Sequence, residues 1–200
     1  MSAVSDTIVK EYFENLGFFV RQPRKYQVVA RPKQADEEID LMVFNPAVSE
    51  QSIPEQPLWG SAELRHISRA VVGLRGWHTE RFSPKILETS PEIYRFAGVE
   101  AMKMVSGIMG EGPVAKILCL PDLPASKPLR KATLEILKSK GIDGVILFRT
   151  ILLELSESVD AQKSYERSDL LQTLRILKNY DLLKYGQMDL FRMKRRTKDE

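Results

Sequence analysis

The chain has 200 residues, of which 43% are hydrophobic and 28% are charged, which is typical of a globular protein rather than a disordered or collagen-like one. Its 30 basic and 27 acidic residues leave a formal charge of +3, which permits a nucleic-acid partner without requiring one. The single cysteine, Cys119, excludes an internal disulfide, and with two histidines it excludes a cysteine and histidine zinc site. No apolar run reaches the ~18 residues of a membrane span and no signal sequence is evident, so we expect a cytoplasmic protein without a membrane partner.

The charges are much less evenly distributed than their sum suggests. Residues 20–33 carry five basic side chains and no acid, and residues 34–63 carry seven acidic side chains and no base. Residues 64–85 are again basic, as are the last nine residues. This order fits a phosphate-binding track beside a carboxylate metal site, and it also fits a solvated surface with internal ion pairs.

The first half of the chain begins with an amphipathic helix. Ser5 or Asp6 caps a helix that runs to Asn15, and Gly17 ends it. Aromatic and β-branched residues then predict strands, and prolines predict a loop. We expect strands at Phe18–Val29, Glu38–Phe44 and Arg69–Trp77, with a loop at residues 46–61.

The second half alternates helices and strands. The cap and proline in Ser90-Pro91-Glu92 predict the start of a helix that runs to Met109. A helical crossover between the last two strands implies that they are parallel. We expect strands at Val114–Leu120 and Asp143–Phe148 and a helix at Pro128–Lys140. The complete order, helix, three strands, helix, strand, helix, strand, predicts an α/β protein with a mixed five-stranded sheet flanked by helices.

The remaining residues predict an appendage to this core. Apolar spacing indicates helices at Thr150–Val159 and, after a Ser168 cap, up to Lys178. The segment DLLKYGQMDLFRM then suggests a hairpin. We expect a core at 1–150 and a helical and hairpin extension at 151–200 that packs on it, the alternative being half of a winged helix that contacts DNA.

The segments EIDLMVFNP and AVVGLRGWH, which follow a first helix and a basic strand, resemble the restriction-endonuclease-like fold. This is the superfamily of PD-(D/E)XK nucleases, which includes Holliday-junction resolvases, and the resemblance covers about residues 5 to 150. In that family an aspartate on the second strand and an acidic-x-Lys motif on the third converge on Mg²⁺. The metal ion polarises the scissile phosphate and activates the attacking water.

The resemblance assigns the strand-two aspartate to Asp40, which is thereby implied as a catalytic residue and a metal ligand. A carboxylate within an apolar strand would be costly to leave unpaired. The other interpretation is that Asp40 pairs with a nearby arginine or caps a turn.

On the third strand the sequence departs from the family's motif. Gly73 stands where the family has an acidic residue, and Arg75 stands where it has lysine. Glycine offers no side-chain oxygen, and arginine can grip a phosphate but does not release a proton. The two substitutions argue against ordinary nuclease chemistry, and they leave Arg75 as the second candidate catalytic residue beside Asp40, able to hold a phosphate.

Basic and aromatic residues beside this motif are candidates for nucleic-acid contacts. Trp77 and His78 at the strand end fit a stacking platform for a base or sugar, although Trp77 equally fits packing under a loop. The expected nucleic-acid-binding residues are Arg21, Arg24, Lys25, Trp77, His78 and Arg81.

Three functions remain open from the sequence. The first is a nucleic-acid-binding protein, DNA favoured over RNA, with a nuclease-like fold and impaired catalysis. The second is an active Mg²⁺-dependent endodeoxyribonuclease whose missing acid has migrated to another element. The third is a protein-interaction scaffold that retains only the fold. Because the family often forms dimers, a homodimer is compatible with each of them. The candidates for a migrated residue are Asp6, Glu11, Glu63, Glu80, Glu92, Glu100 and Lys103.

Overall fold

The computed structural model describes residues 3–23, 39–76, 78 and 81–183. The chain divides into two compact units, Met1–Glu154 and Leu155–Glu200, and the division falls within one helix. Among the described residues, no helix has both the length and the apolar character that crossing a membrane requires.

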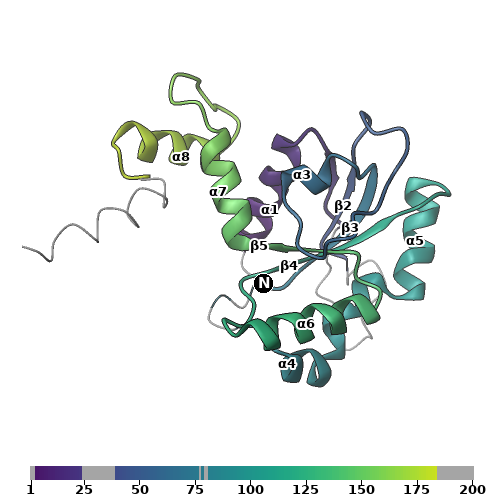
Figure 1. The fold of residues 1–200 in the computed structure, drawn as a ribbon. Coiled ribbons are helices and arrows are strands. Elements are labelled where there is room, and N and C mark those ends of the chain that lie inside the picture. The colour runs from purple at the N-terminus through teal and green to yellow at the C-terminus, as the bar shows by residue number, and fades with distance from the viewer. Residues whose placement is uncertain (1–2, 24–38, 77, 79–80, 184–200) are drawn as a thin grey trace, which may run out of the picture. The chain divides into compact units, whose positions relative to one another are not determined.

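The first unit is built on one mixed sheet of five strands (Figure 1). The strands lie side by side in chain order. The second strand is antiparallel to the first and to the third, and the last two strands continue the sheet parallel to the third. This confirms the predicted α/β class, the mixed five-stranded sheet and the parallel final pair. The strands are β1 (Phe19–Arg21), β2 (Leu41–Phe44), β3 (Arg69–Leu74), β4 (Ala115–Leu120) and β5 (Gly144–Leu147).

Helices flank the sheet on both faces (Figure 1). The first helix ends at Asn15 as predicted, and Gly17 follows with a φ of 87° that favours glycine. Its predicted cap is wrong, because the helix already begins at Ala3, so that Ser5 and Asp6 lie within its first turns. The helices of the chain's described part are α1 (Ala3–Asn15), α3 (Ser61–Leu64), α4 (Pro84–Thr89), the 3₁₀ helix η1 (Pro91–Ala97), α5 (Val99–Met109), α6 (Lys127–Ser139), α7 (Phe148–Ser158) and α8 (Asp169–Asn179).

The prediction of one continuous helix from Ser90 to Met109 is wrong. Gly98 has an extended backbone, with φ −72° and ψ 166°, and it separates η1 from α5. The tighter 3₁₀ winding before it buries Ile93 and Phe96 completely. The strand predictions were too long. The second strand begins at Leu41, so that Asp40 precedes it, and the third ends at Leu74 rather than at Trp77. The first strand, predicted at Phe18–Val29, ends at Arg21, and the part of the prediction after residue 23 lies outside the described residues. The last two strands are shorter than predicted by one or two residues.

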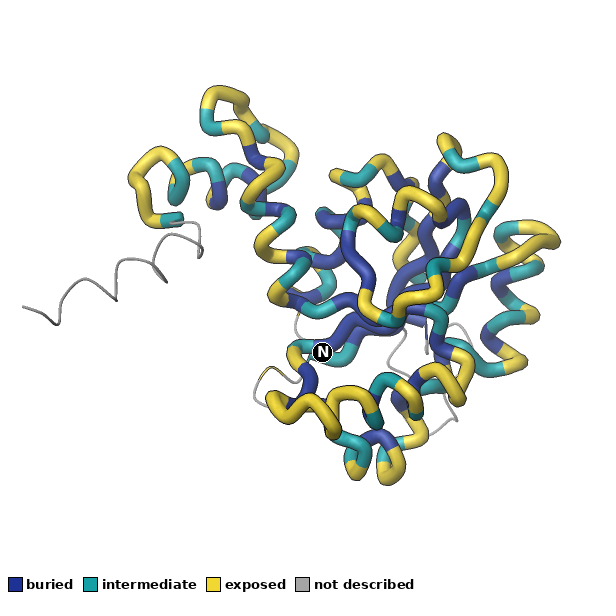
Figure 2. Tube along the Cα trace, viewed as in Figure 1, coloured by how far each residue is buried: buried dark blue, intermediate teal, exposed yellow. Residues whose placement is uncertain are grey.

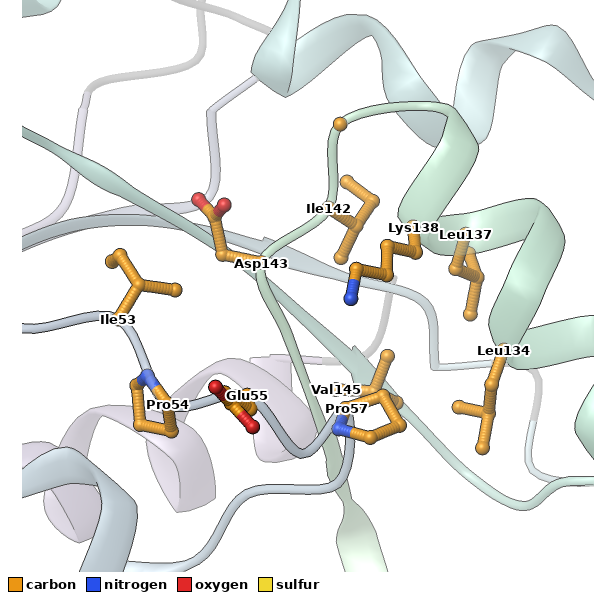
Figure 3. A pocket seen from close by; sticks show the side chains of 11 residues that line it. Ile53, Pro54, Glu55, Pro57, Leu134, Leu137, Lys138, Ile142, Asp143 and Val145 are labelled. Carbon is orange, nitrogen blue, oxygen red and sulfur yellow. The ribbon is translucent and has the colours of Figure 1, made fainter.

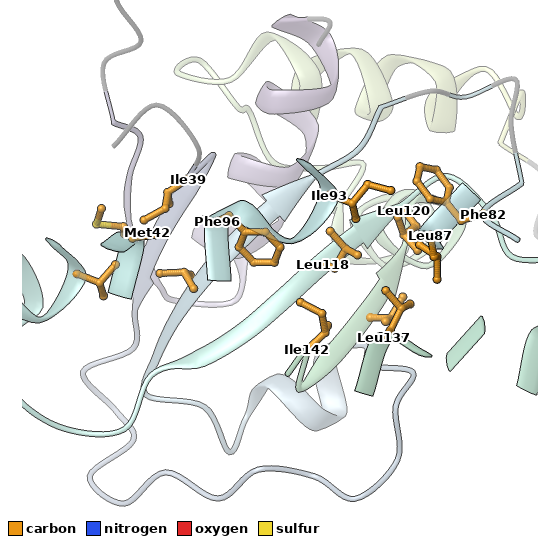
Figure 4. Packing of buried hydrophobic residues seen from close by; sticks show 14 of the residues in the cluster. Ile39, Met42, Phe82, Leu87, Ile93, Phe96, Leu118, Leu120, Leu137 and Ile142 are labelled. Carbon is orange, nitrogen blue, oxygen red and sulfur yellow. The ribbon is translucent and has the colours of Figure 1, made fainter. Parts of the chain in front are cut away.

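One face of the sheet carries a large hydrophobic core (Figure 4). Met42, Val71, Leu118 and Val145 come from four neighbouring strands, and helices α4, α5 and α6 and the 3₁₀ helix η1 cover them. Residues that belong to these covering elements and are at most 2% exposed are Leu87, Ile93, Phe96, Ala101, Val105 and Leu137. Figure 2 shows the sheet as a buried layer between more exposed helices.

Hydrogen bonds to one carboxylate join three helices on the other face. The Tyr12 hydroxyl of α1 donates to Glu154 Oε2 of α7 over 2.6 Å, and the Ser61 N–H of α3 donates to the same oxygen over 3.0 Å. Burial, together with the neighbouring Glu154 carboxylate, raises the pKa of the Tyr12 phenol, so Tyr12 remains a donor over the whole physiological pH range.

The second unit contains α8, whose start was predicted from Ser168. The Ser168 Oγ accepts a hydrogen bond from the Leu171 N–H over 3.2 Å, which confirms the cap. The predicted hairpin lies largely outside the described residues, and the packing of the extension on the core stays a prediction.

Replacing Ser168 with alanine removes this cap. We expect the free energy of unfolding of the second unit to fall by about 1 kcal/mol, because a helix N–H loses its acceptor. The measurement is local hydrogen exchange of the α8 amides. Ser164→Ala, an exposed serine outside the helix, is the matched control. Equal protection in Ser168→Ala and wild type would contradict the prediction.

Candidate functional site

Asp40 lies at the start of β2 and is buried, with 2% of its surface exposed. Its own N–H donates to the Val72 carbonyl over 3.2 Å, which holds the residue against β3. Its Oδ2 accepts a hydrogen bond from the Leu74 N–H over 2.6 Å and another from Arg75 Nη1 over 3.3 Å. The carboxylate is therefore compensated by a backbone N–H and a guanidinium of the same chain.

Arg75 follows β3 and forms the cationic half of this pair. Its side chain is only 11% exposed, and each of its two terminal nitrogens donates twice. Besides Asp40, its acceptors are the carbonyls of Leu74 at 2.6 Å, Glu92 at 3.1 Å and Ile93 at 2.8 Å. The guanidinium thus connects the start of β2, the end of β3 and η1.

The glycine of the motif is covered by an aromatic ring. A Cβ atom added to Gly73 would lie 2.6 Å from two ring carbons of Phe96, closer than non-bonded carbons approach. Phe96 also lies 5.8 Å from the Arg75 guanidinium carbon, within the range of a cation–π contact. The space that an acidic side chain at position 73 would need is filled by Phe96.

These residues do not fit a Mg²⁺ site. Magnesium requires several oxygen ligands in octahedral geometry, and the motif supplies one carboxylate that already accepts from Leu74 and Arg75. In the part of the chain that the structure describes, no three His, Cys, Asp or Glu side chains are grouped closely enough to hold a metal ion.

The neighbouring cysteine is buried beside this pair. Cys119 on β4 is fully buried, and its carbonyl accepts from the Arg75 N–H over 3.0 Å. Burial raises the pKa of the Cys119 thiol, and the negative charge of Asp40 adds to the rise. Such a thiol remains protonated and is not a nucleophile at neutral pH.

The other predicted site residues are spread over several elements. Arg21 is exposed on β1, opposite Met42 in the sheet register. Arg81 is exposed, and its Nε lies 3.5 Å from Asp122 Oδ2. Glu100 and Lys103, proposed as migrated residues, are both exposed on α5. Arg24, Lys25 and Trp77 lie outside the described residues.

The structure gives His78 a partner that the sequence did not indicate. Its Nε2 lies 3.0 Å from the Oγ of Ser5, a buried residue near the start of α1. The His78 ring also makes an edge-to-face contact with Phe148, with ring centroids 4.7 Å apart. These contacts join the segment after β3 to α1 and to the start of α7. The sequence suggests only a helix cap for Ser5. No local sequence pattern relates Ser5 to His78, which lies 73 positions away in the chain.

A second group of residues was also missed. Basic side chains recur along α6 at helical spacing, at Lys127, Arg130, Lys131 and Lys138. The apolar residues of this segment predict the helix, and the basic positions of the same period indicate one charged helix face.

Comparison with protein-family models, with curated proteins and with solved structures finds no match to this chain. The described fold defines the class as an α/β protein with an open, mixed five-stranded sheet flanked by helices. The nuclease resemblance rests on the sequence motifs and on the element order.

Proposed function

We propose that this chain is a nucleic-acid-binding protein of nuclease-like fold that does not cleave its substrate. The observation that carries the proposal is the ion pair between Arg75 and Asp40. It joins the two positions that match the family's lysine and metal-binding aspartate. Because the two side chains bind each other, the positions that are catalytic in the family stabilise the fold in this chain.

The order of the elements supports the nuclease-like fold. A first helix precedes three antiparallel strands, and a parallel strand follows after further helices. This order agrees with the one that the resemblance implies. The Asp40 and Arg75 side chains also meet at the ends of adjacent strands, as the family's motif residues do.

The basic stretches at residues 20–33 and 64–85 support a nucleic-acid partner. The Arg75 guanidinium already donates hydrogen bonds within the fold. We therefore expect other basic residues to contact the phosphates, namely the exposed Arg21 and Arg81 and the sequence-predicted Arg24 and Lys25. Basic side chains that contact phosphates release counterions, and the affinity then falls steeply as salt is raised.

Retarded migration of DNA in a native gel tests the proposal. We expect the purified protein to bind duplex or branched DNA at low salt, with the logarithm of the affinity falling linearly with the logarithm of the salt concentration. Replacing Arg21 and Arg81 together with alanine is expected to lower the affinity and to reduce the salt slope by about 2, since two phosphate contacts are lost. No retardation of either DNA at low salt would contradict the proposal.

Two controls separate binding from catalysis. Lys163→Ala/Arg167→Ala removes two exposed basic residues of the second unit and is expected to leave the salt slope unchanged if the first unit binds DNA. Incubation of labelled DNA with Mg²⁺ or Mn²⁺ is expected to yield no cleavage. Cleavage that disappears in Asp40→Ala would establish the active nuclease instead.

A further inference from the structure

A groove lies between the segment 53–57 and helix α6 (Figure 3). It consists of two adjoining cavities of about 360 and 380 Å³. Both are lined by Glu55, Pro57, Leu134 and Lys138. Each volume falls within the range of small-molecule sites, about 300–1,000 Å³.

The wall opposite α6 is fixed to the sheet. The Val145 N–H donates to the Pro57 carbonyl over 2.8 Å, and the Trp59 N–H donates to the Val145 carbonyl over 2.8 Å. These two bonds bridge Leu58 to β5 in parallel. Because the wall is tied down on both sides of Leu58, the groove is formed before any ligand arrives.

The floor of the groove is apolar and continuous with the hydrophobic core. Leu137, Ile142 and Val145 line it and are at most 4% exposed. Leu134 is half-buried and lies between the two cavities. An apolar group that binds in the groove exchanges its contacts with water for contacts with aliphatic side chains, and this transfer is favourable.

The rim on the α6 side is basic. Lys127, Arg130, Lys131 and Lys138 line the groove along one face of the helix. They outnumber the acidic lining residues, which are Glu135 on the same helix and Glu55 and Asp143 on the opposite side. Lys131 lies 3.8 Å from Glu135, whereas no ion pair with a described carboxylate is formed by Lys127 or Lys138. In Figure 3 the Lys138 amine extends from α6 toward the segment 53–57.

We propose that this groove binds a small amphiphilic anion, a molecule with an apolar body and one carboxylate or sulfonate head. The body contacts the aliphatic floor and the head lies against the basic rim, where an ammonium or guanidinium donates charge-assisted hydrogen bonds. None of the lining residues is aromatic, so the groove lacks the stacking surface that nucleic-acid bases use. The proposal is therefore independent of the DNA-binding function.

The fluorescent sulfonate 1-anilinonaphthalene-8-sulfonate serves as the first probe. We expect saturable binding to the folded protein, with displacement by dodecanoate below its micellar concentration. Dodecyltrimethylammonium has the same tail with a cationic head, and we expect it to displace the probe about tenfold less well or worse. Equal displacement by the two amphiphiles would overturn the proposal.

Matched variants locate the binding. Lys138→Glu reverses a charge on the rim and is expected to lower the affinities for the probe and for dodecanoate by about tenfold or more. Lys103→Glu makes the same change at an exposed position of α5 and is expected to leave both affinities within about twofold. Leu134→Trp fills the groove from its side and is expected to abolish saturable binding, with unchanged circular dichroism to show that the variant is folded. Binding that is equal in wild type, Lys138→Glu and Leu134→Trp would show adventitious association and would overturn the proposal.

Discussion

Replacing Asp40 with asparagine is expected to lower the free energy of unfolding by about 2–4 kcal/mol, because the buried Arg75 guanidinium loses the Asp40 carboxylate of its ion pair. The asparagine oxygen can still accept from the Leu74 N–H, so the loss reports mainly on the ion pair. The measurement is urea denaturation at pH 7, read as a change in midpoint at constant m-value. Glu14→Gln, which removes the acid of an exposed helical pair with Lys10, is expected to cost no more than about 0.5 kcal/mol.

A second variant distinguishes the effect of losing the ion pair from the effect of leaving one of its charges buried alone. Arg75→Met removes the cation and keeps an apolar stem under Phe96. In the double variant with Asp40→Asn we expect part of the lost stability to return, since no unpaired charge then remains buried. A carboxylate held ready for a metal ion behaves in the opposite way, because it is strained in the empty site. If Asp40→Asn stabilised the protein, the structural role assigned to the pair would be wrong.

Restoring the nuclease motif with Gly73→Glu and Arg75→Lys is expected to destroy the fold of the first unit rather than to create a nuclease. The reason is steric, since a Cβ at position 73 would lie 2.6 Å from the Phe96 ring. The milder Gly73→Ala is expected to lower the free energy of unfolding by about 2–3 kcal/mol, the cost of overpacking a well-filled core. Denaturant unfolding measures the alanine variant, and a cleavage assay with Mg²⁺ measures the double variant.

The chain offers a matched control and a direct test of the cause. Gly107 lies in α5 with no atom within 4 Å of an added Cβ, and Gly107→Ala is expected to raise stability by up to about 1 kcal/mol. In a background with Phe96→Leu, Gly73→Ala is expected to cost less than in wild type, because the smaller side chain can make way. An equal cost in both backgrounds would assign the effect to the backbone instead. DNA cleavage by the folded double variant would refute the steric argument.

The fold was predictable from the sequence where local signals act alone. Alternating apolar residues, helix-capping residues and a glycine after a helix indicated the sheet, its parallel end, the end of α1 and the start of α8. The break at Gly98 was missed because the flanking residues keep a helical apolar spacing, and the extended glycine conformation depends on how Ile93 and Phe96 pack on the sheet.

The candidate site was predictable only in part. The positions of Asp40, Gly73 and Arg75 followed from the resemblance, and an arginine partner for Asp40 was one of two interpretations. The Phe96 ring that occupies the space beside Gly73 comes from a 3₁₀ helix that was not expected. The partnership of His78 with Ser5 joins residues 73 positions apart, and such contacts depend on tertiary packing that periodicity does not report.

The bridge at Leu58 has a consequence for how the sheet meets other chains. An edge strand normally presents unpaired N–H and C=O groups that template the addition of a foreign strand. At Val145 both groups are already engaged, by Pro57 and Trp59. The prolines at positions 54 and 57 further limit pairing, since proline has no N–H to donate. The β5 margin is thereby protected at Val145 against edge-to-edge pairing with another chain.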